Sequence, residues 1–277
     1  MTKNRLLSFI ILLFVYVLAT FGGYLIYTKL SCDYKLALFI ADVFATVVTF
    51  IFSVALGNAS VYDPYWSVQP IVIISFFASY RGTNLLGNLL IAAICYWGIR
   101  LTANWAYTFK NLTEQDWRYT MLKEKTKKFY PIINFVGIHM VPTIVVYLCT
   151  LPAVVAIYEI AYFKPLCAVF IALSFAAATI QLIADIQMQM FRKSGVGGFI
   201  RKGLWKHGRH PNYLGEILMW WGIGIACVIS MPEHWYLLAG AFVNTCLFLF
   251  VSIPMAEKRQ GKKPGFEEYK KETRLFI

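Results

Sequence analysis

The stretch "KPLCAVFIALSFAAATIQLIADIQMQM", residues 164–190, is long and apolar enough to cross a membrane as one helix. Comparable apolar runs recur along the 277-residue chain. They cover about 6–28, 36–57, 67–80, 84–107, 131–150, 211–231 and 235–254. We therefore expect an all-α fold, a polytopic transmembrane helical bundle with about seven to eight spans.

The composition supports this fold class. Apolar residues make up 59% of the chain and charged residues 14%, and the mean hydropathy is +0.60. Soluble domains are about 45–50% apolar and about 25% charged. The first run is too long for the apolar part of a signal peptide, so we expect a retained span. The run at 67–80 is short and either spans or re-enters. The segment 151–163 either extends its neighbour or lies at the interface.

Cationic residues are concentrated at the ends of the apolar runs. The chain has 26 lysines and arginines, 14 acidic residues and a net charge of +12. Nineteen of the cations lie in the segments 109–129, 191–210 and 257–277. With eight crossings, an inner N-terminus places all three segments on the inner side, as the positive-inside rule requires. We expect an integral membrane protein with cytoplasmic termini, in a bacterial inner membrane, or in the endoplasmic reticulum if eukaryotic.

Other classes of site and organisation are disfavoured. No segment could form a soluble basic face, so we expect no nucleic-acid partner. The six cysteines are scattered singly, which argues against a disulfide framework and a thiolate metal site. The sequence has no internal repeat, low-complexity tract or linker, so we predict a single integral membrane domain over residues 1–277.

Polar residues on the 164–190 helix share one face. Gln181, Asp185 and Gln189 recur every four residues, and Arg192 follows Asp185 by seven. The face leads into "FRKSGVGGFIRKGLWKHGRH", residues 191–210, which has several glycines, six cations and no acid. Glycines let backbone N–H groups approach a ligand, and arginines bind phosphate. The pattern favours an anion site, and a solvated loop facing lipid phosphates is the alternative.

The stretch "KHGRHPNYLGEIL", residues 206–218, begins the next span. Pro211 suits the first position of a helix, whose N-terminus would add a positive dipole end to the basic loop. Asn212, Tyr213 and Glu216 would then face one direction just below the surface. The arrangement suits an amphiphilic ligand with its phosphates outside and a flat polar ring inside the membrane.

Further polar residues lie beside or within other apolar runs. Asp63 lies among aromatics and prolines in "VYDPYWSVQP", residues 61–70. Arg100 and Asn104 are four apart near the inner end of another span. The four histidines are too few for a membrane di-iron site, so we expect no metal, with a single zinc as the alternative.

Six motifs resemble the steroid 5-alpha-reductase superfamily and, more closely, its DUF1295 branch. They are "SVYDPYWSV" (60–68), "GIRLTANW" (98–105), "EQDWRY" (114–119), "ADIQMQMFR" (184–192), "GLWKHGRHPNYLGE" (203–216) and "IPMAEKRQGKKPGFEEYKKET" (253–273). The reductase-like motifs therefore extend over 60–277, with a C-terminal core at about 98–277.

The resemblance implies a membrane-embedded, NADPH-dependent reductase. A hydride would pass from NADPH to the β-carbon of an enone while a side chain polarises and protonates the carbonyl end. The substrate would be lipophilic, steroid- or lipid-like. Membrane lipid is the other expected partner, and no protein partner is implied. Motif matching and position predict a set of cofactor-binding residues: Arg100, Asn104, Asp185, Arg192, Arg209, His210, Asn212, Tyr213 and Glu216.

The chain departs from the characterised steroid reductases in the catalytic residues. They have a Gln-Glu pair in an early span and a tyrosine three residues before the arginine. Here Asp42 is the only acid in the corresponding span, and Trp97 stands three residues before Arg100. Since a developing enolate needs a general acid, we expect Tyr96 to donate the proton, with Asp63 or Asp42 orienting it.

Two other functions remain open. "RHPNYLGE" and "PGFEEYKK" also resemble the isoprenylcysteine carboxyl methyltransferases and related lipid methyltransferases, which bind S-adenosylmethionine. That cofactor has no phosphate and so has no use for six cations interleaved with glycines. A lipid-binding scaffold or a transporter is the third possibility, although the sequence lacks the internal symmetry common in transporters.

Overall fold

The described part of the chain has an all-α fold, as predicted. This computed structural model describes residues 2–276, of which 81% are helical, and there are no strands among them. The chain forms two compact units. We call Met1–Pro70 with Leu101–Tyr147 the N-terminal unit, and Ile71–Arg100 with Leu148–Ile277 the C-terminal unit. The single domain expected over residues 1–277 stays a prediction.

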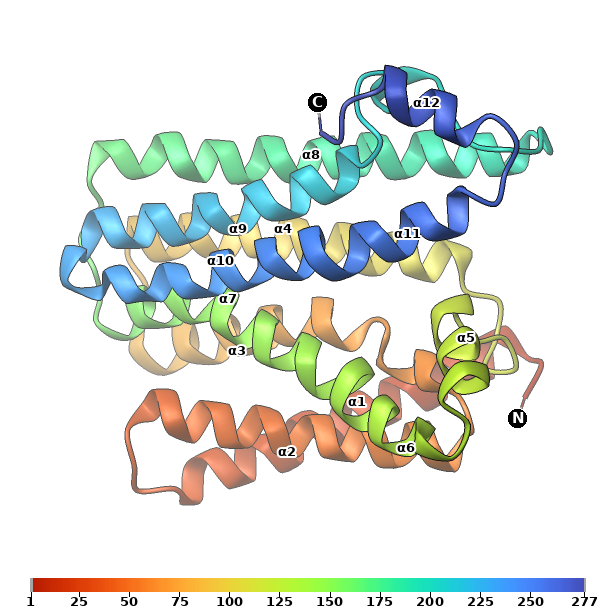
Figure 1. Cartoon of the computed structure of the whole chain (residues 1–277). Helices are drawn as coiled ribbons and strands as arrows, with labels where there is room; N and C mark the ends of the chain where they lie inside the picture. The colour runs from red at the N-terminus through yellow and green to blue at the C-terminus, as the bar shows by residue number, and fades with distance from the viewer. Residues whose placement is uncertain (1, 277) are drawn as a thin grey trace. The chain divides into compact units, whose positions relative to one another are not determined.

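Three helices contribute residues to both units, because the division falls within α3, α4 and α7 (Figure 1). Their bounds are Tyr65–Arg81 for α3, Leu85–Thr108 for α4 and Val141–Tyr158 for α7. The N-terminal unit also contains α1 (Arg5–Lys29), α2 (Tyr34–Ala55), η1 (Ala59–Tyr62), α5 (Trp117–Thr126), η2 (Lys127–Phe129), α6 (Tyr130–Ile133) and η3 (Asn134–Met140). The C-terminal unit also contains α8 (Pro165–Lys193), η4 (Gly203–Lys206), α9 (Pro211–Ser230), η5 (Pro232–Leu238), α10 (Ala239–Leu247), η6 (Phe248–Ser252), α11 (Ile253–Gln260) and α12 (Phe266–Glu272).

The predicted transmembrane helical bundle is confirmed. Within residues 2–276, seven helical stretches are long and apolar enough to cross a membrane: Arg5–Lys29, Tyr34–Ala55, Leu85–Thr108, Trp117–Tyr158, Pro165–Lys193, Pro211–Ser230 and Pro232–Gln260. The short run at 67–80 forms α3, which has 17 residues and is not among the seven. Helix α7 continues to Tyr158, so the apolar segment after residue 150 largely extends its neighbour. The orientation of the termini stays a prediction.

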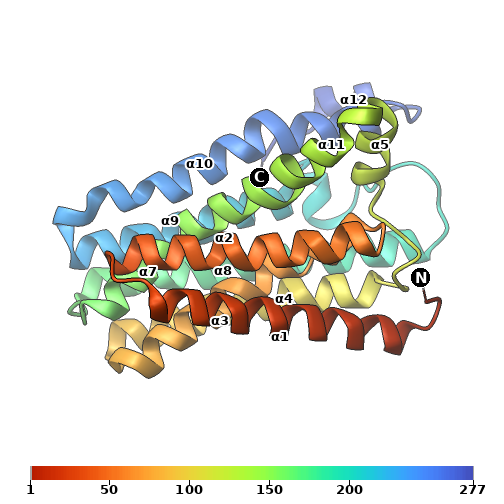
Figure 2. The ribbon, with the colours of Figure 1, turned by 90° about the horizontal axis from the view of Figure 1, so that it is seen from below.

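In the N-terminal unit, α1 and α2 lie side by side (Figure 2). Each begins at a side-chain cap, where Asn4 accepts from the Leu7 amide and Asp33 from the Lys35 amide. The helices approach closely at Gly23, where a Cβ would lie 3.1 Å from the Ala41 carbonyl oxygen. Small residues at such a contact are typical of helices packed within a membrane.

In the C-terminal unit, α8 and α9 pack closely at two glycines of α9. A Cβ at Gly215 would lie 2.6 Å from the Ala177 carbonyl oxygen, and one at Gly222 would lie 2.6 Å from the Phe170 carbonyl oxygen. Both glycines and both carbonyls are seven residues apart, which is two helical turns. The two backbones therefore touch along a seam, and this seam fixes how the polar residues of α8 face those of α9.

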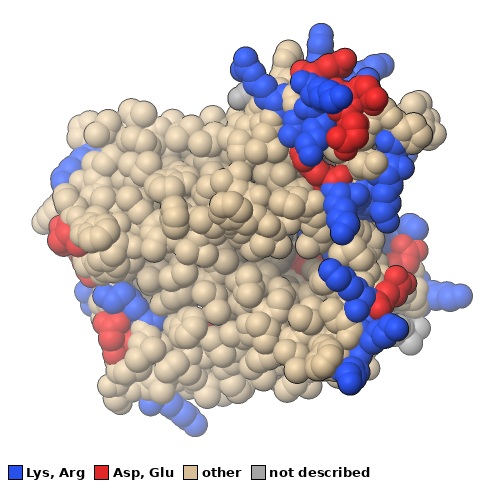
Figure 3. Space-filling view, in the orientation of Figure 1, with Lys and Arg blue, Asp and Glu red and all other residues tan. Residues whose placement is uncertain are grey.

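On the face of the C-terminal unit that Figure 3 shows, charged side chains gather near one end. Figure 3 shows lysine, arginine and acidic side chains gathered around α12, whereas the surface over α10 is almost free of charge. Phe242 and Phe250, on α10 and η6, are 60% and 74% exposed. An exposed apolar flank with charged ends is the surface expected of a membrane-embedded bundle.

Candidate functional site

The first part of the candidate site is an ion pair between α4 and α8. Arg100 on α4 donates to Asp185 at 3.0 Å and also to Gln181, one turn earlier on α8. The Arg100 side chain is 4% exposed and that of Asp185 15%. The shared face predicted from the spacing of Gln181 and Asp185 is therefore turned toward Arg100. A charge in this position is tolerated because its partner is held in place by the helix seam.

The second part is a buried carboxylate between two indoles. Glu216 on α9 accepts from Trp97 Nε1 at 2.8 Å and from Trp220 Nε1 at 2.9 Å. The two indole rings are 4.8 Å apart and nearly perpendicular. Each carboxylate oxygen thus already has a protein donor. The expected role of Glu216 as a direct cofactor ligand stays a prediction, and its observed role is to hold Trp97 and Trp220.

Of the five buried side-chain polar atoms that have no hydrogen-bond partner in the described part of this unit, three lie on α4, α8 and α9. They are Arg100 Nε and Gln181 Nε2, which are donors, and Asn212 Oδ1, which is an acceptor. Such atoms are rare in folded proteins and usually have a partner, water or a ligand included. Gln181 packs against Gly215, next to Glu216, and Asn212 lies one turn before Glu216. A ligand or water that bonded all three atoms would have to supply both acceptors and a donor.

The predicted proton donor lies one turn from the ion pair. Tyr96 precedes Arg100 by four residues on α4, so the two share a face. Its hydroxyl lies 3.1 Å from the Thr179 hydroxyl on α8. Thr179 also donates to a backbone carbonyl of its own helix, at Phe175. The tyrosine hydroxyl is therefore positioned against α8, the helix that also bonds Arg100.

The basic loop after α8 has the open backbone expected of an anion site. Gly195 and Gly198 have positive φ angles, and a Cβ at Gly195, Gly197 or Gly198 would meet nothing within 4 Å. Its exposed cations are Arg192, Lys193, Arg201, Lys202 and Lys206. Of the predicted ligands, Arg192 thus stands at the surface, where it is accessible to an anion.

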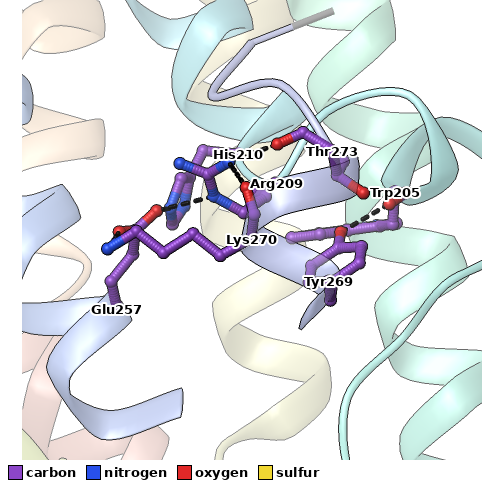
Figure 4. A network of polar contacts seen from close by, with 7 residues as sticks. All are labelled: Trp205, Arg209, His210, Glu257, Tyr269, Lys270 and Thr273. Carbon is purple, nitrogen blue, oxygen red and sulfur yellow. Dashed lines mark hydrogen bonds and ion pairs between the residues drawn. The ribbon is translucent and has the colours of Figure 1, made fainter. Parts of the chain in front are cut away.

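Arg209, by contrast, is engaged by the C-terminal segment (Figure 4). Its guanidinium donates to Glu257 at 2.8 Å, to the Lys270 carbonyl at 3.1 Å and to the Thr273 carbonyl. Lys270 also pairs with Glu257 at 3.0 Å. Nearby, the Tyr269 hydroxyl donates to the Trp205 carbonyl (Figure 4). The sequence predicted Arg209 as a cofactor ligand, and that role stays a prediction. Glu257 was missed, because its partners lie 13 and 48 residues away.

His210 immediately precedes α9, as predicted, and its ring is fixed on two sides. It stacks on Tyr213, with ring centroids 5.2 Å apart and planes within 5°, and its Nε2 lies 3.3 Å from Glu257. Burial lowers the pKa of His210, and the contact with Glu257 only partly opposes this. A neutral His210 adds no charge to the anion site, so its contribution is a ring of fixed orientation.

The remaining predicted residues belong to the N-terminal unit. Asp42 Oδ1 accepts from the Tyr65 hydroxyl at 3.1 Å, and Asp63 Oδ1 accepts from the Tyr119 hydroxyl at 2.6 Å. Each aspartate therefore orients a tyrosine, but of its own unit. The pairing of either with Tyr96 stays a prediction. Asn104, on the part of α4 in this unit, is half-buried, and its role as a cofactor ligand stays a prediction.

Asp63 is part of a structural element that joins two of the quoted motifs. Residues 58–63 and 114–119 lie together, and the hydrogen bonds between them join positions 56 apart. The bonded pairs are Asn58 with Glu114, Ala59 with Gln115, Ser60 with Asp116, and Asp63 with Tyr119. "SVYDPYWSV" and "EQDWRY" are thus two halves of one packed element.

Replacing Asp63 by asparagine should change how stability depends on pH. Burial raises the pKa of Asp63 to about 6, although Arg118 and the bond from Tyr119 oppose the shift. A raised carboxyl pKa gives stability that is present at low pH and is lost as pH rises through about 6. The side chain of Asp63→Asn cannot ionise. The free energy of unfolding of this variant relative to the wild type should therefore increase by about 1–2 kcal/mol between about pH 4.5 and about pH 7.5.

This difference can be followed as melting temperatures of the detergent-solubilised protein at the two pH values. The difference in melting temperature between Asp63→Asn and the wild type should change by about 2–6 °C from the lower to the higher pH. Glu124→Gln, at an exposed position on α5, is the control and should show no such change. An Asp63→Asn advantage that does not vary with pH would contradict the assignment.

No metal centre is formed by the protein's own ligand-type side chains in the part described. Within residues 2–276, no three histidine, cysteine, aspartate or glutamate side chains are close enough together to hold an ion. His210 and Glu216, which could in principle ligate a metal, are engaged with Glu257 and with the two indoles, respectively.

Comparison with known proteins agrees with the motifs. The family described as "Protein of unknown function (DUF1295)" matches residues 49–273, most of the chain. No curated protein and no solved structure matches the chain. The resemblance to DUF1295 drawn from the motifs is therefore confirmed, and the chain belongs to the DUF1295 family.

Proposed function

We propose that this protein is a membrane-embedded, NADPH-dependent reductase. It would reduce a C=C bond conjugated to a carbonyl in a lipophilic substrate. The observation that carries the proposal is the set of unpaired buried atoms on Arg100, Gln181 and Asn212. They lie in a membrane helix bundle whose α8 leads into a basic, glycine-rich loop. A ligand with a polar ring and phosphates matches both features.

The donors and acceptors of this unit fit a nicotinamide nucleotide. A carboxamide needs both donors and acceptors, which Asn212, Gln181 and Arg100 offer. Arg192 and the loop cations would hold the phosphates, while the glycines leave room for backbone N–H groups to approach. Asp185 would keep the Arg100 guanidinium in place.

NADPH, when bound, would supply a hydride. The chain must supply a proton, and Tyr96 is our candidate because its hydroxyl is held by Thr179 one turn from Arg100. A positioned acid of this kind contributes about 10²–10⁴-fold to a rate. The two indoles held by Glu216 would form apolar walls that keep water from the reacting carbon.

One observation favours a different cofactor. Arg209 is already bonded to Glu257 and to the C-terminal segment, and burial lowers the pKa of His210, so neither residue readily offers a free charge to a phosphate. S-adenosylmethionine carries no phosphate. A lipid methyltransferase is therefore the second candidate, and its cofactor is a necessary arm of the test.

Titration of the purified, detergent-solubilised protein with NADPH, followed by fluorescence, tests the proposal. We expect micromolar binding that weakens about tenfold in Asn212→Ala, which loses one buried hydrogen bond to the ligand. Arg192→Ala should also weaken binding and make it less sensitive to salt. Lys29→Ala removes an exposed cation at the end of α1 and should leave binding unchanged.

The outcomes separate the two candidates. NADPH binding that depends on both residues and is not displaced by S-adenosylmethionine would support the reductase and justify a screen of lipophilic enones. Saturable S-adenosylmethionine binding without NADPH binding would overturn the reductase in favour of a methyltransferase. Equal NADPH binding by all four proteins would mean that the nucleotide does not use this site.

A further inference from the structure

A row of buried polar side chains runs along one face of α2 in the N-terminal unit. Asp42, Thr46, Thr49 and Ser53 follow one another at spacings of four, three and four, so they share a face. All four are at most 4% exposed. Serine and threonine are common where membrane helices pack, but an ionisable residue such as Asp42 inside the bundle is unfavourable and typically marks a functional site such as a proton relay.

Hydroxyl groups of other elements extend this row. The Thr143 hydroxyl on α7 lies 2.8 Å from that of Thr46 and 2.7 Å from that of Tyr62 in η1. Each hydroxyl can accept one hydrogen bond while it donates another. A proton that arrives on one oxygen can therefore leave from the other side as the next bond forms. Thr49 donates to the Ala45 carbonyl, which leaves its oxygen able to accept.

Asp42 is the member of the row that lies farthest from the C-terminal end of α2. Its Oδ1 accepts from Tyr65, its Oδ2 is buried without a partner, and both amide atoms of Gln69, one turn after Tyr65, are also unpaired. Within residues 2–276, no lysine, arginine or histidine pairs with Asp42. The other titratable groups that face it are the hydroxyls of Tyr62 and Tyr147. A buried carboxylate without a cation is very unfavourable, whereas a carboxylic acid is not.

A π-helical segment borders the same row. In η3, the His139 ring lies 4.7 Å from that of Tyr62, and its Nδ1 bonds the Asn134 carbonyl at 2.9 Å. His139 Nε2 is fully buried and has no partner. Single π-helical turns occur often at functional sites, and here the turn places a second group capable of carrying a proton beside the row.

The other end of the row reaches the end of α2. Ser53 is two residues before Ala55, where α2 ends, and its hydroxyl is buried without a partner. Its backbone carbonyl accepts from the Asn58 amide in the following loop. From Ser53 to Asp42 the helix rises by about 16 Å, roughly half the apolar thickness of a bilayer.

We propose that Asp42 is a protonated carboxyl group that exchanges its proton with water through the bonded hydroxyls of Tyr62, Thr143, Thr46 and Tyr65. The proton passes from hydroxyl to hydroxyl along this bonded chain, whereas Thr49, which bonds the Ala45 carbonyl, and the unpaired Ser53 only line the row. Each transfer breaks one O–H bond and forms another, so no charge is left behind. The proposal is independent of the reductase activity and requires no cofactor.

Infrared spectroscopy of the protein in liposomes tests this directly. A protonated Asp42 contributes a carboxylic C=O band that should vanish in Asp42→Asn. On transfer to D2O the band should shift quickly in the wild type and at least tenfold more slowly in Thr46→Val and Thr143→Val. Thr150→Val, two turns further along α7 and outside the row, should exchange like the wild type.

Thr46→Ser keeps the hydroxyl and should restore rapid exchange. This control shows whether slow exchange in Thr46→Val comes from loss of the hydroxyl or from altered packing. If no carboxylic band disappears in Asp42→Asn, the carboxyl is ionised and the proposal is wrong. If both valine variants exchange as fast as the wild type, the proton reaches Asp42 by another route and the proposed path is wrong. Because Thr46 and Thr143 lie on different helices, misfolding of one variant leaves the other to decide.

Discussion

Replacing Arg100 by methionine is expected to lower the free energy of unfolding by about 3–5 kcal/mol. Arg100 is almost fully buried and serves both Asp185 and Gln181. Methionine fills a similar volume, but it leaves the Asp185 carboxylate without its cation. Removal of one partner of a buried pair is more destabilising than removal of both, because the remaining charge keeps its desolvation penalty. Denaturant titration of the solubilised protein, followed by tryptophan fluorescence, measures the loss.

The double variant Arg100→Met with Asp185→Asn is the matched control. It removes the stranded charge, so it should be more stable than Arg100→Met alone by at least about 1 kcal/mol. If the double variant is instead as unstable as the two single losses added together, Arg100 and Asp185 do not act as a pair. In that case Gln181, rather than Asp185, would be the partner that stabilises Arg100.

Replacing Gly222 by alanine is expected to destabilise the protein by about 3 kcal/mol, the upper part of the range for overpacking. The new Cβ would lie 2.6 Å from the Phe170 carbonyl oxygen and would also overlap the Ser174 hydroxyl. The carbonyl is backbone, so it can move only if α8 moves. Ser174 also donates to the Met219 carbonyl at 3.0 Å, and separation of the helices would break this bond.

Gly224→Ala, two residues later on the same helix, tests whether the loss comes from packing. There the nearest atom is Leu238 Cδ2 at 3.1 Å, the end of a flexible side chain. Alanine is favoured over glycine in a helix by up to about 1 kcal/mol, so Gly224→Ala should be neutral or slightly stabilising. Melting temperatures of the two variants give the comparison. Equal destabilisation at both positions would mean that the α8–α9 seam is not the cause.

The helical, membrane-spanning nature of the chain follows from local pattern alone. An apolar run of about 20 residues has few alternatives in a membrane, because every backbone group must be satisfied within the helix. The start of α9 was equally predictable, since Pro211 suits the first helical position. The common face of Gln181 and Asp185 needed only the helical period. These features depend on residues within a few positions of one another.

The partners of the polar residues were not predictable in this way. The sequence suggested that Asp42 or Asp63 orients Tyr96, whereas the observed bonds are Asp42 with Tyr65 and Asp63 with Tyr119. A carboxylate near several tyrosines can bond any of them, and only the packing of the helices decides which one is near. The indoles that hold Glu216 show the same limit, because Trp97 is 119 residues away along the chain.

The sequence by itself determined that this is an α-helical membrane protein of the DUF1295 type, with polar groups at the C-terminal end of α8 and the start of α9. Hydrophobic length and helical period act over single elements, so they can be read directly. Tertiary structure alone decided that Arg209 is bonded to the C-terminal segment and that both carboxylate oxygens of Glu216 accept hydrogen bonds from indoles. It also decided that Arg100, Gln181 and Asn212 each have a buried polar atom without a partner. Hydrogen bonds act over about 3 Å, and only the folded chain brings residues tens of positions apart to that distance.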